Sequence, residues 1–441
     1  MHKTLRIMLG AAALLAATPA LASGEGAPPR GDEPVAVPRS IKQGVDFVYV
    51  DPAMSTVARR HQRPQNWLSR IFNIDFGGGK RAAPNPLFQQ LARGMQQYQT
   101  RWGRLPQTKI PAGPVLKRGS TGRRVDMLRQ RLGLGPGTYD ANLFQAVATY
   151  QTVHGIGPAD GIAGRATIAS LNLGAQHYLR RLAINVERAY RLPQTRTFDR
   201  YVVVDSGAAE TYLFDRDRVV DGMKVVVGAP KTKTPMIAVI MRNAKVNPYW
   251  NVPPELIRSL TATRIREQGL SYLRDFHYEV LSDWSGNGRV IDPKTVNWKA
   301  IASGKQEPTI LVRQLPGPWN SMRHMKFEMP NDYGIYLHDT PHTDLFAKND
   351  RWVSNGCVRL QDYRRFATWV FGYVPQATTK REQKFDLPRP VPIYLTYLTV
   401  EPSQNGVVFR PDRYGWDELA MPQMFGNQVA SASGDPALMR S

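Results

Sequence analysis

The sequence predicts a multidomain α+β protein in which a helical N-terminal half precedes a mainly-β unit. The chain has 441 residues, which at roughly 150 residues per domain is enough for two or three domains. Before about residue 172 apolar residues recur at three- and four-residue steps, as in Phe88, Leu91 and Met95, which is typical of amphipathic helices. From Arg200 onward apolar and polar residues alternate in short runs, which indicates strands joined by tight turns.

The composition limits the kinds of protein and partner. Hydrophobic residues make up 42% and charged residues 21%, so the chain as a whole is globular. Lys and Arg number 58 against 36 Asp and Glu, and the net charge of +22 favours an anionic partner: nucleic acid, acidic lipid or a carboxylate-rich polymer. The single cysteine, Cys357, excludes a disulfide scaffold, a cysteine-based zinc finger and an iron–sulfur cluster.

Residues 1–22 have the pattern of a secretory signal peptide. Basic residues at Lys3 and Arg6 precede a short apolar run, which ends at the small-x-small sequence Ala20-Leu21-Ala22. The run is too short to span a membrane, and no later stretch is long enough. We therefore expect an exported protein without a transmembrane segment, in which residues 23–40, rich in Gly, Pro and Ala, form a flexible leader.

Two helical units are predicted next. Residues 41–114 contain short helical patches and are interpreted as a scaffold subdomain, whose basic run at residues 59–63 fits either a solvated helix face or a contact with an acidic surface. Residues 115–173 predict three short helices. A Gly-Ser-Thr-Gly turn at residues 119–122 starts the first, residues 144–151 lie in the second, and Ile168 and Leu171 lie in the third.

The segment 115–173 resembles the type 1 peptidoglycan-binding domain. The matching features are the turn with Gly119 and Gly122, the helix at residues 144–151, and the sequence Asp-Gly-Ile-Ala-Gly-Arg-Ala-Thr at residues 160–167. The resemblance implies attachment to the cell wall, although domains of this type also serve as spacers.

Residues 200–415 predict the mainly-β unit. A helical stretch from Pro254 to about Phe276 and a polar stretch that follows it interrupt the strands, so residues 254–308 are interpreted as an inserted helical subdomain. The pattern fits either a lid over a site or surface decoration. Strands resume and continue to about residue 415, and the small-residue tail at 416–441 is predicted to be disordered.

Cys357 lies in a turn whose neighbours suit a nucleophile. A free thiol titrates near about 8.5 and is only slightly ionised at neutral pH, so a nucleophilic cysteine needs a base, and His338 lies upstream. Gly356 permits a sharp turn that exposes the sulfur and brings backbone N–H groups toward a developing oxyanion. Arg359 favours nearby negative charge. A buried structural cysteine is the alternative interpretation.

The C-terminal half resembles the L,D-transpeptidases with a YkuD catalytic domain, in the long Gram-negative (YcbB-like) branch, where an inserted subdomain covers the active site. The matching stretches, in the expected order, are VVVGAPKTKTP, NPYWNVPPELI, RQLPGPWNSMRHMKFEMPN, YLHDTP and SNGCVRL, the last at residues 354–360. Many members of the wider superfamily have His where this chain has Asn355.

The resemblance implies roles for particular residues. Cys357 becomes the nucleophile and His338 the general base, with the N–H groups of Gly356 and Cys357 as oxyanion donors. The supporting residues are Ser354, Asn355 and Arg359, and the expected substrate-groove residues are Tyr336, Trp250, Trp319, Asn320 and Asp339. Core packing is an alternative for the tryptophans, and a turn that fixes the end of the strand bearing His338 is an alternative for Asp339.

No metal or other cofactor is expected. His338 and His342 have the four-residue spacing of a helical zinc pair, but Pro341 lies between them and there is no HExxH signature. His342 is interpreted as an exposed loop residue.

The reaction implied by the resemblance is formation of 3→3 cross-links between peptidoglycan stems in the periplasm. A thioester forms on Cys357 with release of D-Ala, and such enzymes are carbapenem targets. Water as acceptor would make the protein an L,D-carboxypeptidase, and a protein amine would make it an enzyme that anchors outer-membrane proteins. A noncatalytic wall-binding protein is the non-enzyme alternative. Nucleic acid is not an expected partner, because no recognition motif accompanies the charge.

Overall fold

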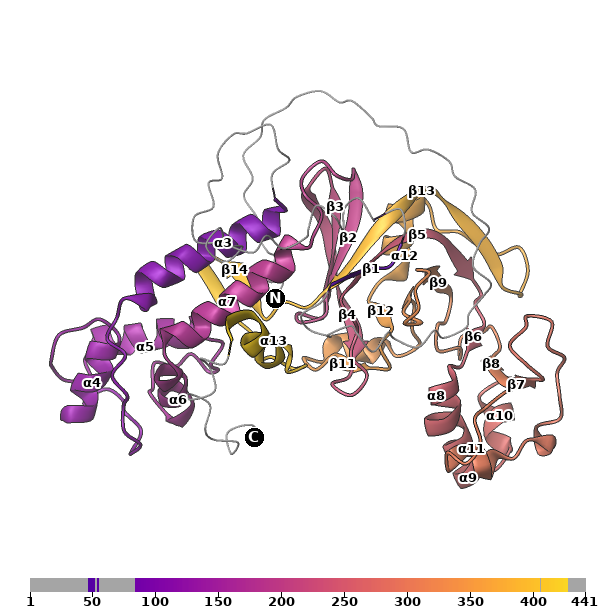
Figure 1. Cartoon of the computed structure of the whole chain (residues 1–441), viewed down its shortest axis with the longest axis horizontal. Coiled ribbons are helices and arrows are strands. Elements are labelled where there is room, and N and C mark those ends of the chain that lie inside the picture. Colours follow the sequence, from indigo (N-terminus) through magenta and orange to yellow (C-terminus); the bar gives the residue numbers. More distant parts are fainter. Residues whose placement is uncertain (1–46, 52–53, 55–83, 405, 427–441) are drawn as a thin grey trace.

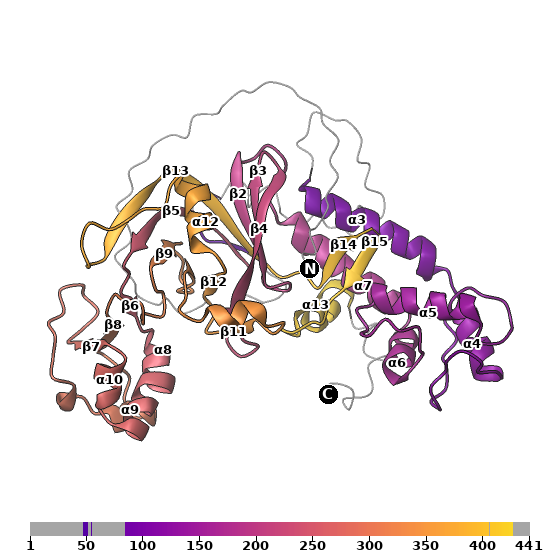
Figure 2. The same cartoon turned by 180° about the vertical axis from the view of Figure 1, so that it is seen from behind.

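The structure is a computed structural model and describes residues 47–51, 54, 84–404 and 406–426. It contains a helical part, a central β-sheet and an inserted unit, and the helical part and the inserted unit lie at opposite ends of the molecule (Figures 1 and 2). The fold is therefore mixed helix and sheet. The predicted signal peptide, the leader and the basic run at residues 59–63 lie outside the described residues.

The helical part is built on two long helices, α3 (Pro86–Tyr98) and α7 (Ala175–Tyr190), which lie side by side (Figure 1). The side chain of Asn85 caps α3 by accepting from the N–H of Leu87, and Pro86 at the first turn lacks the N–H that a helix start leaves unpaired. The π-helix η2 (Gln99–Gly103) continues α3. The apolar sides of both helices share one core with three further helices, α4 (Arg123–Arg131), α5 (Ala141–Val153) and α6 (Arg165–Leu173).

Within the described residues ten strands form the central sheet, and its first and last strands longer than two residues also pair, so the sheet closes. The order is β1-β5-β13-β2-β3-β4-β12-β10-β9, β9 also pairs with β5, and β11 pairs with β4. The strands are β1 (Val48–Tyr49), β2 (Arg200–Asp205), β3 (Glu210–Asp215), β4 (Arg218–Gly228), β5 (Ile237–Val246), β9 (Met325–Glu328), β10 (Leu337–His338), β11 (Trp352–Ser354), β12 (Val358–Leu360) and β13 (Gln383–Thr396). The largest apolar core lies on one side of these strands and includes helix α12 (Tyr363–Phe371), whose Phe366 packs edge-on against Phe327 of β9.

An inserted unit leaves the sheet after β5 and returns before β9. Its first and last strands, β6 (Trp250–Asn251) and β8 (Leu311–Gln314), pair with each other, and β7 (Tyr278–Leu281) pairs with β8. Between them lie α8 (Pro254–Leu256), η3 (Ile257–Ala262), α9 (Thr263–Gln268), α10 (Ser271–Asp275), η4 (Pro293–Thr295) and α11 (Trp298–Ala302). This unit has an apolar core of its own. Within residues 254–308 the sequence predicted a helical stretch and a polar stretch and missed β7, because a four-residue strand lacks a long alternating pattern.

Two other segments differ from the sequence-based expectations. Residues 48–49, within the predicted helical scaffold, form a strand that pairs in parallel with β5. The hairpin of β14 (Val400–Ser403) and β15 (Gly406–Phe409), expected in the catalytic sheet, is a separate sheet whose apolar side chains join the core of the helical part. Both segments are too short for their partners to be read from periodicity.

The predicted disorder of residues 416–441 is wrong for the first ten of them. Residues Trp416–Phe425 form helix α13, which packs on α7. Trp416 and Asp417 are each 1% exposed. Asp417 makes ion pairs with Arg188 at 2.6 Å and with Arg181 at 3.0 Å. These buried charges tie the C-terminal helix to the helical part, and residues 427–441 lie outside the described part.

The described residues contain no helix that is both long and apolar enough to cross a lipid bilayer.

Candidate active site

His338 lies on β10, Cys357 immediately precedes the neighbouring parallel strand β12, and the two side chains face the same side of the sheet. In the register of β10 and β12, Leu337 is opposite Val358 and His338 is opposite Arg359. Leu337 and Val358 are fully buried in the apolar core. Because side chains alternate along a strand, His338 and Arg359 face away from that core, together with Cys357, which immediately precedes β12. The strand pairing therefore brings together the thiol, the imidazole and the guanidinium that the sequence singled out.

The hydrogen bonding of His338 fixes its tautomer. Its Nδ1 lies 2.6 Å from the carbonyl oxygen of Asp339, and because a carbonyl can only accept, Nδ1 carries the proton. Nε2 is then the basic nitrogen of the ring. His338 is 4% exposed, and burial, followed by the charges of Arg359 and Lys326, lowers its pKa to about 3. The imidazole is neutral at physiological pH and can accept a proton.

The Cys357 thiol is also neutral at physiological pH. Burial raises its pKa, although a hydrogen bond from the backbone of Tyr336 and the charges of Lys326 and Arg359 oppose this effect. Its Sγ lies 3.5 Å from the carbonyl oxygen of Gly334. The arrangement is a neutral thiol and a neutral base, so proton transfer must accompany nucleophilic attack.

A tight turn at residues 354–357 presents the thiol. Gly356 has a φ of 115°, a conformation that favours glycine, and a Cβ there would lie 3.0 Å from Cδ1 of Ile335. The Ser354 hydroxyl donates to the carbonyl oxygen of Cys357 at 2.7 Å and accepts from the N–H of Gly356 at 3.2 Å. Asn355 is exposed at the tip of the turn.

The two N–H groups expected to bind the oxyanion differ in their hydrogen bonds. The N–H of Gly356 is already bonded to Ser354, so it stabilises the turn. The N–H of Cys357 makes no hydrogen bond to any described residue and stays available. The sequence could not separate these two donors because their use depends on the rotamer of Ser354.

Loop residues 229–236, between β4 and β5, brace this turn from behind. Thr232 donates from Oγ1 to the carbonyl oxygen of Ser354 at 2.8 Å, and Thr234 donates to that of Gly356 at 2.7 Å. Both threonines belong to the matched stretch VVVGAPKTKTP, but spacing alone assigned them no role. Their partners could be identified only once the loop was placed.

The five expected groove residues lie in different environments. Tyr336 is partly exposed beside Cys357. Trp250 packs against the core of the inserted unit, while Trp319 is 44% exposed and its ring stacks on His277 with 3.8 Å between ring centroids. Asn320 is fully buried, and its amide donates to three backbone carbonyls, those of Pro248, Gln314 and Leu315. Asn320 thus joins the two connections between the sheet and the inserted unit.

Asp339 is buried and supports the end of β10. Its Oδ2 lies 2.8 Å from Nδ1 of His324, and its Oδ1 accepts from the N–H of Thr340 at 2.7 Å. These contacts match the turn interpretation of this residue. His342 is exposed in the segment that follows, whereas His338 is buried, so the two histidines occupy different environments.

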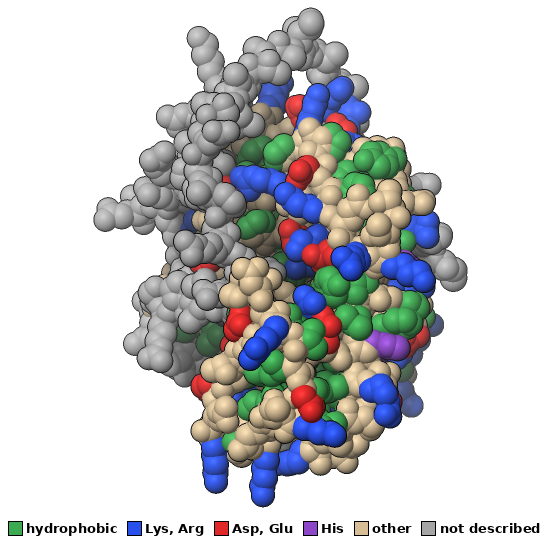
Figure 3. Space-filling model, turned by 90° about the vertical axis from the view of Figure 1, so that its right-hand side faces the viewer, with side chains coloured by type: hydrophobic (Ala, Val, Ile, Leu, Met, Phe, Trp, Pro, Cys, Tyr) green, Lys and Arg blue, Asp and Glu red, His purple; other side chains and the backbone are tan. Residues whose placement is uncertain are grey.

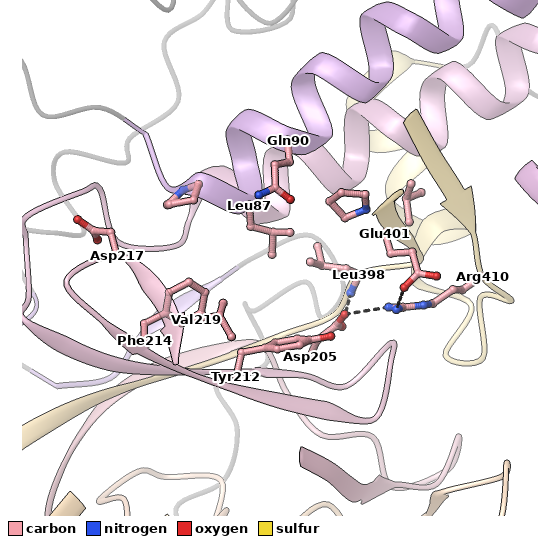
Figure 4. A pocket seen from close by; sticks show the side chains of 13 residues that line it. Leu87, Gln90, Asp205, Tyr212, Phe214, Asp217, Val219, Leu398, Glu401 and Arg410 are labelled. Atoms are coloured by element: carbon pink, nitrogen blue, oxygen red, sulfur yellow. Dashed lines mark hydrogen bonds and ion pairs between the residues drawn. The ribbon is translucent and has the colours of Figure 1, made fainter. Parts of the chain in front are cut away.

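A pocket elsewhere in the molecule is lined by neither Cys357 nor His338. It lies between α3, strands β2 to β4 and the β14–β15 hairpin (Figure 4). Asp205 and Arg410 form an ion pair of 3.3 Å there, and burial, offset mainly by Arg410, raises the pKa of Asp205 to about 6. The pocket contains no residue of β10 or β12. These charges connect the sheet to the hairpin.

Residues 199–393 match the family model of the YkuD L,D-transpeptidase catalytic domain. A curated Haemophilus influenzae protein named "Putative L,D-transpeptidase" is 28% identical over 246 residues, which are 54% of this chain and 48% of that protein. The chain thus spans about half the length of this relative.

Similar solved structures also have L,D-transpeptidase names. A Mycobacterium smegmatis enzyme is 16% identical, with 45% of this chain and 58% of that chain covered and a TM-score of 0.22. A Xylanimonas cellulosilytica structure is 15% identical, with 65% and 98% covered and a TM-score of 0.19. The family match, which includes both β10 and β12, identifies residues 199–393 as a YkuD L,D-transpeptidase catalytic domain.

Proposed function

We propose that the protein is a periplasmic L,D-transpeptidase that forms 3→3 cross-links between peptidoglycan stems through a thioester on Cys357. The observation that carries the proposal is the shared face of His338 on β10 and Cys357 just before the paired strand β12, with Nδ1 of the histidine bonded to a carbonyl. The family match over residues 199–393 supports the same chemistry. The net charge of +22 suits a wall polymer with repeated carboxylates.

In the first half-reaction Nε2 of His338 takes the thiol proton while Sγ of Cys357 attacks the carbonyl carbon between the third stem residue and the terminal D-Ala. The N–H of Cys357 is available to the developing oxyanion. The carbon–nitrogen bond then breaks, and D-Ala leaves as an amine that takes the proton from His338. The thioester conserves the free energy of the broken amide.

In the second half-reaction the side-chain amine of another stem attacks the thioester carbonyl. His338 accepts the proton of that amine and returns it to the departing sulfur, which restores the thiol. No cofactor enters this balance. The inserted unit, which returns to the sheet immediately before β9, is proposed to act as the lid over the reacting groups. The three helices α4 to α6 are proposed to hold the enzyme on the wall.

The test is incubation of the purified protein with disaccharide tetrapeptide, followed by mass analysis of the products. We expect a cross-linked dimer and free D-Ala, and neither from Cys357→Ala. Tripeptide alone would identify water as the acceptor, and an adduct on an added outer-membrane protein would identify a protein amine. A carbapenem should also raise the mass of the wild-type protein by one drug molecule and leave Cys357→Ala unchanged. Unaltered substrate together with an unmodified protein would leave the wall-binding alternative.

A further inference from the structure

Lys326 is a buried lysine on the same face as the thiol and the imidazole. It lies in β9 between Met325 and Phe327, whose side chains are in the apolar core. Lys326 therefore faces the opposite side, and in the strand register it lies directly beside His338. Only 6% of the residue is exposed, although lysine is among the side chains least often buried.

The ammonium group of Lys326 lies over the ring of Tyr336. Tyr336 precedes Leu337, which pairs with Val358 of β12 and with Phe327 of β9. Continuing the same register by one residue places Tyr336 opposite Cys357. The Nζ atom of Lys326 lies 3.6 Å from the centroid of the Tyr336 ring. The positive charge is thus one strand away from the sulfur, above an aromatic ring that is partly exposed.

The chain leaves this ammonium group incompletely paired. Among the described residues it makes no hydrogen bond, and its ion pair with Oε1 of Glu328 is 3.6 Å long. Oε1 of Glu328 lies closer to Nζ of Lys245, at 3.1 Å. Lys245 also makes an ion pair of 3.1 Å with Glu382. An ammonium group has three donors, and a buried charge without close partners is costly.

The reacting groups therefore lie in a positive field. Lys326 and Arg359 flank His338 from the two neighbouring strands. Glu328, the carboxylate that pairs with Lys326, lies closer to Lys245, so it offsets this field only in part. Both cations lower the pKa of His338, which makes the imidazole a weaker base until an anion binds.

We propose that the ammonium group of Lys326 binds a carboxylate of the donor stem next to the bond that Cys357 attacks. The proposal rests on the proposed function and names the ligand group of that site. Two carboxylates of a tetrapeptide stem have this chemistry: the side-chain carboxylate of the third residue and the C-terminal carboxylate of the leaving D-Ala. A bound carboxylate would accept hydrogen bonds from the N–H groups of Lys326. Its negative charge would also reduce the effect of the Lys326 charge on the pKa of His338.

The test compares Lys326→Met with wild type on three donors: the free tetrapeptide, its C-terminal amide and the amide of its third-residue carboxylate. For the free donor we expect kcat/KM of Lys326→Met to fall roughly 10- to 100-fold, the range of a hydrogen bond to a charged group. On one of the two amides kcat/KM of Lys326→Met should equal that of wild type. The carboxylate that this amide replaces is the one that Lys326 binds. Lys326→Arg should recover much of the loss.

Controls separate this role from a structural one. Lys384→Met removes a lysine from the exposed part of β13, where it pairs with Asp386 at 2.9 Å, and should leave all three donors unaffected. If Lys326→Met lost the same factor on every donor, Lys326 would only support the strands. If wild type favoured neither carboxylate over its amide, the proposal would also fail, even where Lys326→Met does not fold. Wild type that converts no donor would instead refute the proposed function.

Discussion

Thr234 donates a hydrogen bond from Oγ1 to the carbonyl oxygen of Gly356 at 2.7 Å, and this bond orients the peptide that carries the N–H of Cys357. A peptide unit is planar, so fixing its carbonyl also fixes the direction of its N–H. The same hydroxyl accepts from the N–H of Gly228 at 2.9 Å, and Tyr414 donates to the carbonyl oxygen of Gly228 at 2.7 Å. A chain of hydrogen bonds thus connects the segment before α13 to the nucleophile turn.

Replacing Thr234 by Val should slow acylation of Cys357. Valine keeps the shape of threonine but leaves a buried carbonyl and a buried N–H without their partner, at a cost of about 1–3 kcal/mol per group. We expect the rate of carbapenem acylation, followed by mass spectrometry, to fall roughly 10- to 100-fold because the N–H and the Sγ of Cys357 lose their fixed positions. Thr234→Ser should retain most of the rate.

The matched control is Thr149→Val, which removes an exposed helical hydroxyl bonded to the carbonyl oxygen of Gln145. It should acylate at the wild-type rate. An equally fast Thr234→Val, folded to the same extent, would show that the turn keeps its geometry without this bond.

The sequence predicted the parts of the site that depend on local pattern. The family match spans Cys357 and His338, which the sequence singled out from their local motifs, but alternation did not predict the short strand β12. What it could not give depends on which strands become neighbours. Lys326 reaches the site only because β9 pairs with β10, and the sequence HMKFEM by itself is an ordinary amphipathic strand.

The fold shows the same division. The period of the apolar residues predicted helices before Arg200 and strands after it, which the mixed fold confirms. The two-residue strand β1 and the helix α13 are held by long-range contacts that periodicity cannot reveal. Helix α13 depends on Asp417, whose arginine partners lie more than 200 residues earlier in α7.

The rate of alkylation of Cys357 should depend on pH in the way expected of a thiol that is neutral at physiological pH. Burial raises its pKa above the ordinary value, and only the thiolate reacts with iodoacetamide. The rate constant should therefore keep rising as the pH passes 9. Because Lys326 lowers this pKa, Lys326→Met should shift the curve to higher pH, and Lys384→Met should not. A rate that is constant from pH 5 to 8 would indicate a stable thiolate–imidazolium pair and would contradict the neutral one.

Asp417→Asn should destabilise the helical part strongly. The carboxylate is 1% exposed and balances Arg188 and Arg181, so its neutralisation leaves two guanidinium groups without their counter-charge. Breaking a buried pair in this way costs about 3–5 kcal/mol. Urea denaturation would measure this loss, and Glu418→Gln, an exposed change on the same helix, should alter the free energy of unfolding by less than about 0.5 kcal/mol. Equal stability of the two variants would contradict the role of Asp417 in docking α13.

His154 should make the protein less stable in acid. Its ring lies between Tyr150 and Phe409, and its Nε2 lies 2.9 Å from the hydroxyl of Tyr98, which connects α5 to α3 and β15. Burial, together with the charges of Arg181 and Arg131, lowers its pKa to about 3. Below pH 6.5 the unfolded chain binds a proton that the folded chain does not, so stability is complete above pH 6.5 and falls as the pH drops toward 3.

Between pH 7 and pH 4.5 this difference amounts to about 2–3 kcal/mol from His154 alone. His177 and His338 have lowered pKa values of about 4 and about 3, and they add to the slope. His154→Phe keeps an aromatic ring in the cluster and removes the titrating group, so its free energy of unfolding should depend less on pH than that of wild type. His342→Gln, an exposed change, should keep the wild-type slope. If His154→Phe also kept that slope, the ring of His154 would be able to take up a proton in the folded state, and the tight packing of α5 against α3 and β15 would not hold in acid.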